Sequence, residues 1–166
     1  RVAVLTGADI QLNQEFQPFE GKEDFGKNTG LKNWQLPLRL AETKAVWEWY
    51  NWRRGLIAPV EPNQGHKILA KWEKAFPNFF LITQNIDGLH QKAGSKNILE
   101  LHGNIWKLRC VKEGTIKDNR DFPLKEIPPR CPSCGELLRP HVVWFGESLD
   151  YEILQRAYAL SSSCEL

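Results

Sequence analysis

Four polar side chains follow two apolar runs of the sequence, where they could hydrogen-bond to a ligand. Gln84, Asn85 and Asp87 come directly after one β-type apolar run, and His102 comes directly after a second. Open α/β sheets bind their ligands at the carboxyl ends of their strands. We therefore expect these four side chains to lie at one ligand-binding edge of a sheet.

Each of these residues also has a simpler explanation. Asn85 and Asp87 are residue types that cap helices and form Asx-turns after strands. His102 precedes Gly103, and a partly buried histidine before a turn glycine is common. The functional interpretation therefore depends on the combination of residues and not on any one of them.

The whole stretch from Leu81 to Gly103, LITQNIDGLHQKAGSKNILELHG, resembles the catalytic core of the sirtuins, the NAD-dependent protein deacylases. The resemblance implies removal of acyl groups from protein lysines, with nicotinamide and O-acyl-ADP-ribose as the other products. In that family the acyl-lysine carbonyl oxygen attacks the anomeric carbon of the nicotinamide ribose, and a base then deprotonates a ribose hydroxyl. The alternative is a sirtuin-like module that binds acyl-lysine peptides without turnover. A dehydrogenase is disfavoured, because Gly7 alone does not make a G-x-G-x-x-G fingerprint.

The same resemblance implies a role for each residue of the motif, with His102, Asn85 and Asp87 as the catalytic residues. His102 corresponds to the family's base, and an imidazole that titrates near neutrality suits that role. Asn85 would orient the ribose hydroxyls and a water, with Gln84 beside the same sugar. Asp87 would accept a hydrogen bond from the nicotinamide carboxamide, with Ile86 packed on the ring.

A second stretch, Val143-Trp144-Phe145-Gly146-Glu147, resembles the segment along which sirtuins bind their peptide substrates. There the acyl-lysine peptide adds as an extra strand, so main-chain hydrogen bonds provide affinity and one pocket provides specificity. The alternative is a buried core strand, which fits Trp144 better than it fits Gly146 or Glu147.

The aromatic-rich helix expected near Thr43–Arg54 contains Tyr50 and Arg53. Residues three apart share a face of a helix, so the phenol and the guanidinium would converge. The pair resembles the one that binds the distal carboxylate in the desuccinylating and demalonylating sirtuins, and a guanidinium suits a carboxylate. We expect succinyl or malonyl groups as substrates, and also acetyl groups. The alternative is a solvated arginine, which is what we expect of Arg54.

The pair Cys131-x-x-Cys134 has the spacing and the turn residues of a zinc knuckle. Cys110 lies where a partner pair would begin, but Glu113 stands at its second position, so the four-cysteine pattern is three-quarters present. We expect a structural zinc bound by Cys110, Cys131 and Cys134. The fourth ligand could be Glu113, another side chain or a water. The remaining alternative is that no metal binds.

The amino-terminal loop departs from the family. Gly7, Ala8 and Phe19 match cofactor-binding positions, but the loop that should end in Phe-Arg-Gly has Glu20 in place of arginine. A carboxylate about 4 Å from a pyrophosphate charge costs roughly 4 kcal/mol at an effective dielectric of 20, or about a thousandfold in affinity. Asp9 and Glu15 add further negative charges. Three explanations compete: the protein binds its cofactor differently, it is a pseudoenzyme, or the amino-acid sequence of this stretch is wrongly assigned. We favour the third.

The order of the elements predicts an α/β fold, a Rossmann-like parallel sheet with helices on both faces, with a small zinc-binding module and a helical insertion. The resemblance to the sirtuins further implies that carboxyl-terminal strands of the sheet are missing from this sequence. One helix, Asn63–Phe76, should present Leu69, Trp72 and Phe76 on a single apolar face. The expected divisions are a discontinuous NAD-binding domain (1–26, 61–103 and 140–166), the helical insertion (27–60) and the zinc module (104–139).

Composition limits the partners that we expect. The 166 residues have a formal net charge of +2, too small to favour nucleic acid, and no apolar run is long enough to span a membrane. Four cysteines with one isolated at Cys164 do not form a secreted disulfide framework. We therefore expect a cytoplasmic protein, and we expect it to be a monomer. The resemblance to the sirtuins implies that it uses NAD and binds acyl-lysine proteins or peptides, and the cysteine spacing adds zinc.

Overall fold

The computed structural model describes residues 1–11 and 44–164, and these form two compact units. Unit 1 comprises residues 1–11, 61–103 and 148–164, and unit 2 comprises residues 44–60 and 104–147. Unit 2 thus takes in the described part of the expected helical insertion together with the expected zinc module. The finer division into three parts stays a prediction.

Unit 1 is built on a parallel sheet of three described strands, as the sequence predicted. The strands are β1 (Val2–Thr6), β2 (Phe79–Thr83) and β3 (Ile98–Glu100), in the order β1-β2-β3. In the register of the sheet, Thr6 pairs with Thr83, and Thr83 pairs with Glu100. The three strands therefore end at the same edge, where the predicted ligand-binding residues follow them.

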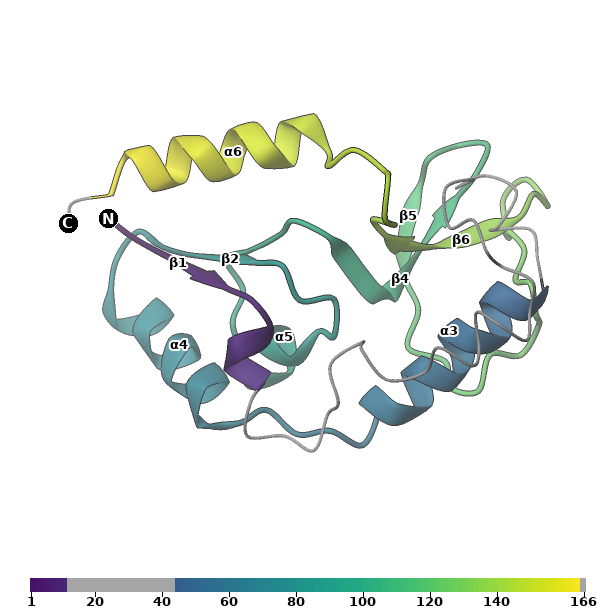
Figure 1. The fold of residues 1–166 in the computed structure, drawn as a ribbon, viewed down its shortest axis with the longest axis horizontal. Helices are drawn as coiled ribbons and strands as arrows, with labels where there is room; N and C mark the ends of the chain where they lie inside the picture. Colours follow the sequence, from purple (N-terminus) through teal and green to yellow (C-terminus); the bar gives the residue numbers. More distant parts are fainter. Residues whose placement is uncertain (12–43, 165–166) are drawn as a thin grey trace. The chain divides into compact units, whose positions relative to one another are not determined.

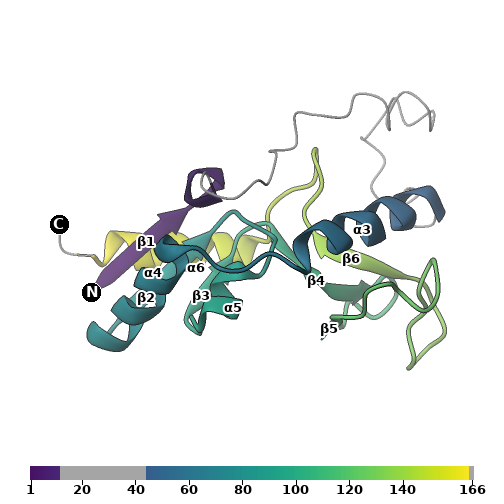
Figure 2. The same cartoon turned by 90° about the horizontal axis from the view of Figure 1, so that it is seen from below.

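Helices cover both faces of this sheet, because the strands alternate buried side chains between the two faces (Figures 1 and 2). Helix α4 (Gln64–Ala75) places Leu69 against Leu81 on one face. Helix α6 (Tyr151–Ser162) places Ala157 against Ile82 on the other face. Two short helices, η1 (Ala8–Gln11) and α5 (Leu89–Ala93), follow β1 and β2.

Helix α4 lies where the sequence predicted, but its apolar face is different. Trp72 and Phe76 are 44% and 45% exposed, and their rings contact each other edge to face. The side of α4 that is buried carries His66, Leu69 and Ala70. The prediction about Trp72 and Phe76 was wrong because side chains four apart can cover each other on the outside of a helix.

Unit 2 contains an antiparallel sheet and helix α3 (Lys44–Ile57). Its strands are β4 (Gly103–Cys110), β5 (Ile116–Asp118) and β6 (Leu138–Val142), in the order β5-β4-β6. The predicted antiparallel strand within Ile105–Cys110 is confirmed by its pairing with β5. The sequence did not predict β5 or β6.

Arg54 holds α3 against the sheet of unit 2 and is not the solvated arginine that we expected. Its side chain is 1% exposed and donates to the Ile105 carbonyl oxygen from Nε and Nη2, at 3.0 and 2.7 Å. Nη1 donates to Oδ1 of Asn119, and the guanidinium lies 5.4 Å from the Trp106 ring centroid. Burial lowers the pKa of Arg54 to about 10, although the charge of Asp121 opposes this. The expectation failed because sequence spacing did not reveal the carbonyl acceptor in β4.

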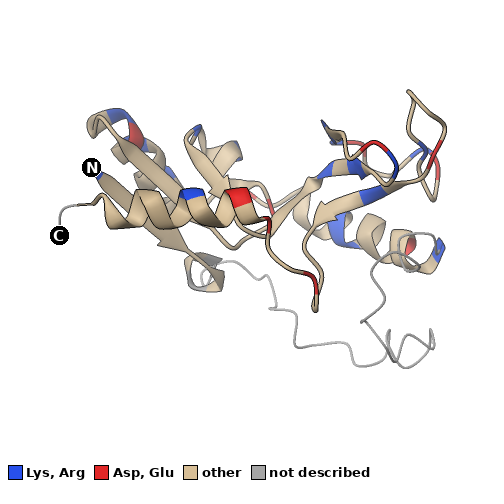
Figure 3. Cartoon of the chain, turned by 90° about the horizontal axis from the view of Figure 1, so that it is seen from above, with Lys and Arg blue, Asp and Glu red and all other residues tan. Residues whose placement is uncertain are grey.

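Basic and acidic residues are interspersed along the described elements, as Figure 3 shows. This pattern agrees with the small net charge. Among the described residues no helix is long and apolar enough to cross a membrane.

Candidate functional site

The ends of β1 and β2 are joined through Asn85 and Gln84. The Asn85 side chain donates from Nδ2 to the carbonyl oxygen of Gly7 at 3.0 Å. The Gln84 backbone N–H donates to the Thr6 carbonyl oxygen at 3.0 Å. The Gln84 side chain is exposed at the surface of this edge. Residues that are far apart in the sequence thus form one polar edge, as the strand-end argument predicted.

The third strand adds His102 to the same edge. Its Nδ1 lies 2.9 Å from the carbonyl oxygen of Gln84. A carbonyl oxygen only accepts, so Nδ1 carries the proton and the neutral ring keeps its lone pair on Nε2. The imidazole is half-buried, and the hydrogen bond to Gln84 sets its orientation. The geometry provides a nitrogen base at the edge of the sheet.

Asp87 is buried, and one of its oxygens makes the turn that the simpler explanation expected. Its Oδ1 accepts from the backbone N–H of Leu89, the first residue of α5, at 2.8 Å. Gly88 between them has φ 74°, a left-handed conformation that glycine adopts without strain. Ile86 beside it is half-buried. The carboxylate is thus held in a fixed orientation by an Asx-turn.

A chain of hydrogen bonds beneath this edge was missed by the sequence analysis. His90 Nε2 lies 3.0 Å from Oγ1 of Thr6, which donates to Oγ1 of Thr83 at 2.9 Å. Thr83 Oγ1 also accepts from the backbone N–H of Asn85 at 3.1 Å. Because Thr6 donates its hydroxyl proton to Thr83, it accepts from His90, which fixes the proton of His90 on Nε2. The signal available in the sequence was the threonine that ends each of β1 and β2.

His66 lies against His90, with ring centroids 4.7 Å apart, and both side chains are almost fully buried. His66 Nδ1 is 2.7 Å from Oδ1 of Asn63, the residue that caps α4. Burial, together with the neighbouring His66, lowers the pKa of His90 to about 4. Burial also lowers the pKa of His66, although the charge of Asp87 opposes this. Both imidazoles are therefore neutral near pH 7.

In unit 2 the predicted zinc ligands come together, and Glu113 joins them. One ligand atom from each of four residues lies within 4.8 Å of all the others: Cys110, Glu113, Cys131 and Cys134. The sulfur atoms of Cys110 and Cys134 are 3.6 Å apart, close to the roughly 3.8 Å that tetrahedral zinc with 2.3 Å Zn–S bonds requires.

The backbone around these residues also suits a metal. Gly114 and Gly135 donate to the carbonyl oxygens of Cys110 and Cys131, and both glycines have positive φ. Backbone N–H groups of Cys134 and Ser133 lower the pKa of the Cys131 thiol, which favours its thiolate form. Three thiols and one carboxylate fit zinc, which would cross-link the two turns of this unit.

The predicted acyl-chain and peptide-binding residues also lie together in unit 2. Tyr50 is 6% exposed, and its hydroxyl accepts a hydrogen bond from Nε1 of Trp144 at 2.7 Å. Arg53 is half-buried one turn further along α3. Val143 is half-buried, and the Phe145 side chain is 73% exposed.

Glu147 faces inward to the buried guanidinium of Arg139, with contacts of 2.6 and 2.8 Å. Burial raises its pKa, but the hydrogen bonds and charge of Arg139 dominate and hold the pKa of Glu147 below its ordinary value. The carboxylate is therefore ionised, and its Oε2 also accepts from the Trp144 backbone N–H at 2.9 Å. The Glu147 backbone N–H donates to the Trp144 carbonyl oxygen, which closes the turn that contains Gly146.

Some predicted residues cannot be placed. Phe19, Glu15 and Glu20 lie outside the described residues. Gly7 follows β1 and Ala8 begins η1, and a Cβ on Gly7 would lie 3.5 Å from Oε1 of Gln84. The amino-terminal turn therefore contacts the polar edge.

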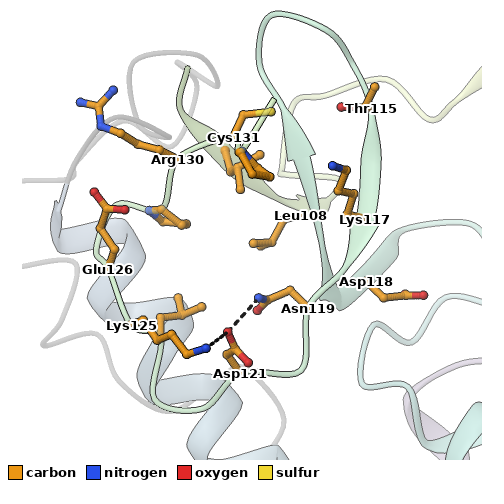
Figure 4. A pocket seen from close by; sticks show the side chains of 14 residues that line it. Leu108, Thr115, Lys117, Asp118, Asn119, Asp121, Lys125, Glu126, Arg130 and Cys131 are labelled. Atoms are coloured by element: carbon orange, nitrogen blue, oxygen red, sulfur yellow. Dashed lines mark hydrogen bonds and ion pairs between the residues drawn. The ribbon is translucent and has the colours of Figure 1, made fainter. Parts of the chain in front are cut away.

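A hollow of about 340 Å³ lies in unit 2, and it is lined by residues of β4, of β5 and of the chain that follows β5 (Figure 4). Two of its lining side chains contact Asp121: Asn119 donates to Oδ2 of Asp121 at 3.4 Å, and Lys125 pairs with the same carboxylate at 3.8 Å. Of the predicted site residues only Cys131 lines it. Tyr50 and Trp144 of the same unit do not line it.

A sequence model of the Sir2 family matches residues 27–166. An NAD-dependent protein deacylase of Aquifex aeolicus is 54% identical over 96% of this chain and 67% of its own length. The NAD-dependent protein deacylase 1 of Caldanaerobacter subterraneus subsp. tengcongensis is 44% identical over 98% of this chain and 68% of its own length.

Solved structures agree with these relatives. A Sir2 homologue in complex with NAD superimposes with a TM-score of 0.72 at 38% identity, over 96% of this chain and 62% of that one. A Sir2 protein bound to an acetylated peptide gives 0.76 at 30% identity, over 98% and 67%. The chain thus spans about two thirds of the length of the proteins that it matches.

Proposed function

Because the chain belongs to the Sir2 family, we propose that it removes acyl groups from protein lysines with consumption of NAD. The observation that supports this most directly is the geometry of His102. Its Nδ1–H is held by the Gln84 carbonyl, which leaves Nε2 as a base at the edge where the strands of unit 1 end. NAD, when bound, supplies the ribose that accepts the acyl group.

The residues of the polar edge can each perform one part of this reaction. Nε2 of His102 takes the proton from a ribose hydroxyl, which makes the oxygen nucleophilic toward the acyl carbon. Asn85 and Gln84 orient the ribose. Asp87, fixed by its Asx-turn, accepts a hydrogen bond from the nicotinamide carboxamide. The threonines and His90 beneath them keep the strand ends in register.

We further propose that the preferred acyl groups are succinyl and malonyl, with acetyl also accepted. Tyr50 and Arg53 lie three residues apart on α3, so their side chains share a face. A guanidinium can pair with a carboxylate through two parallel hydrogen bonds, and an acidic acyl chain ends in a carboxylate.

The test is nicotinamide release by the full-length protein with succinyl-lysine and acetyl-lysine peptides. Arg53→Met should lower succinyl-lysine turnover about ten- to a hundredfold, since a hydrogen bond to a charged group contributes roughly 1.5–3 kcal/mol. Acetyl-lysine turnover should be unchanged or higher. Equal use of both peptides by the native protein, with no effect of Arg53→Met, would refute the acidic-acyl preference while leaving deacylation intact.

One observation favours a second candidate, a sirtuin-like module that binds acyl-lysine peptides without turnover. Glu20 stands where the family has arginine, and Asp9 and Glu15 add charges that oppose a pyrophosphate. The same assay separates the two candidates. Peptide binding without nicotinamide release would support the binding module, and release would exclude it.

A further inference from the structure

Trp144 makes three separate side-chain and backbone contacts in unit 2. Its indole Nε1 donates to the Tyr50 hydroxyl at 2.7 Å, and its backbone N–H donates to Oε2 of Glu147 at 2.9 Å. The Arg139 guanidinium lies over its ring, 4.1 Å from the centroid. The indole is therefore held on one face by a cation and at its edge by a phenol.

The cation that holds the ring is itself fixed. Arg139 is 6% exposed, and it pairs with both carboxylate oxygens of Glu147, at 2.6 and 2.8 Å. Its Nη2 also donates to the Val142 carbonyl oxygen at 3.1 Å. Bidentate charge-assisted pairs of this kind restrict geometry more than single hydrogen bonds do. The indole N–H consequently has a defined direction, and that direction is toward Tyr50.

The hydrogen bond from Trp144 determines what the Tyr50 hydroxyl can still do. A phenol has one O–H donor, and its oxygen is here occupied as an acceptor by the indole. Burial raises the pKa of Tyr50 above its ordinary value, although the Trp144 hydrogen bond opposes this, so the phenol stays protonated. The hydroxyl therefore remains a donor, and a donor is what a carboxylate needs.

We propose that Trp144 is a positioning residue for acyl selectivity: its indole N–H orients the Tyr50 hydroxyl as a donor toward the distal carboxylate of the acyl chain. This inference rests on the proposed preference for acidic acyl groups. It gives Trp144 a function through its side chain, in addition to the main-chain role expected for the peptide-binding segment. It also links that segment to the residues of α3 that read the acyl group.

The experiment removes only the indole N–H. Trp144 in the full-length protein is replaced by 3-benzothienylalanine, in which sulfur takes the place of N–H and the ring shape is kept. The measured quantity is the ratio of kcat/KM for succinyl-lysine to kcat/KM for acetyl-lysine peptide, so that any general loss cancels. A net hydrogen bond of about 0.5–1.5 kcal/mol predicts a roughly two- to tenfold fall in this ratio, through a higher KM for the succinyl peptide.

A double-substitution cycle shows whether the effect acts through Tyr50. In a Tyr50→Phe background the same replacement of Trp144 should leave the ratio unchanged, because no hydroxyl remains to be oriented. The same replacement at Trp52, a half-exposed tryptophan of α3, is the matched control and should not alter the ratio. Thermal unfolding of each variant checks that the fold is kept.

Two results would overturn the inference. One is an unchanged ratio in the Trp144 variant, including the case of equal losses with both peptides, which would show a general structural role. The other is an equal fall of the ratio in the Tyr50→Phe background. Failure of the proposed function looks different. In that case the native protein itself would show no preference for succinyl-lysine.

Discussion

At the scale of single residues, the proposed chemistry depends on which nitrogen of His102 carries the proton. The Gln84 carbonyl holds the proton on Nδ1 and leaves Nε2 to act as the base. That base is needed only after the bond between nicotinamide and the ribose has broken. Replacing it should therefore separate the two halves of the reaction.

We expect His102→Tyr or His102→Ala to abolish acyl transfer while nicotinamide cleavage continues in part. Asn85→Ala is the comparison, and it should reduce both steps because ribose orientation is needed throughout. Nicotinamide and O-acyl-ADP-ribose are measured separately in the same reactions. Loss of both steps to the same extent in the His102 variants would show that this histidine is structural.

Because His66 and His90 are buried, we expect the free energy of unfolding to decrease in acid. The pKa of His90 falls to about 4 in the folded protein from an ordinary value of about 6.5, so between these values the unfolded chain binds more protons. Stability is fully present above about pH 6.5 and is lost as the pH falls toward 4. The slope due to His90 is at most about 1.4 kcal/mol per pH unit.

The measurement is the urea midpoint of unfolding between pH 7 and pH 4.5. His90→Gln should lower stability at pH 7, because the hydrogen bond to Thr6 changes. Its stability should nevertheless depend less on pH than that of the native protein. Parallel pH profiles for the two proteins would show that His90 does not contribute to acid sensitivity.

At the scale of elements, the turn after β4 and the turn at Cys131–Cys134 are held together by four candidate ligands. Outer-sphere changes at metal sites already cost about 10–100-fold in affinity, so loss of a ligand should cost at least as much. We expect Glu113→Ala to weaken zinc binding by at least about tenfold, and Glu113→Cys to strengthen it. Competition against a chromophoric chelator measures both.

Glu136→Ala is the matched control, because this exposed glutamate lies beside the ligands but outside the four-residue cluster. Chelation should also lower the melting temperature of the native full-length protein, since a structural metal contributes to folding. An unchanged fold and melting temperature after chelation would show that zinc does not stabilise this unit.

At the scale of the whole molecule, the acidic loop that follows Gly7 and precedes residue 27 is the part that departs from the family. The match to the Sir2 family model begins at residue 27, after the acidic loop. The genetic code provides a specific explanation. Consider a reading frame that starts at the third base of the Pro18 codon and continues to Gly21. In that frame the codons can encode Phe-Arg-Gly, the sequence that ends the cofactor loop in the family. The middle position is the most restrictive, because the codons of Phe19 and Glu20 then allow arginine and no other amino acid.

We therefore expect the native protein to carry the displaced reading frame in this segment, with arginine in place of a glutamate charge at the cofactor. Nucleotide sequencing of the gene and mass spectrometry of peptides between Gly7 and Val46 test this directly. Peptides that contain Pro18-Phe19-Glu20-Gly21 would refute it. A changed mode of cofactor binding, or a loss of turnover, would then be the remaining explanations.

The sequence by itself determined the sheet, the family and the polar edge. Apolar runs that end in Gln84, Asn85 and His102 indicate strand ends whatever packs around them, because parallel strands bring their carboxyl ends to one edge. The bounds of α4 and the three cysteines followed from local rules of capping and spacing. These features depend on residues that are close together in the chain.

Only the tertiary structure decided the features that depend on partners far apart in the chain. Arg54 is buried because a carbonyl of β4 faces it, and no spacing in α3 could reveal that acceptor. The proton of His102 is assigned by a carbonyl 18 residues away, and the Tyr50 oxygen accepts a hydrogen bond from an indole 94 residues away. A buried polar group must find a hydrogen-bond partner, but the sequence does not say which one, since that choice is made when the elements pack.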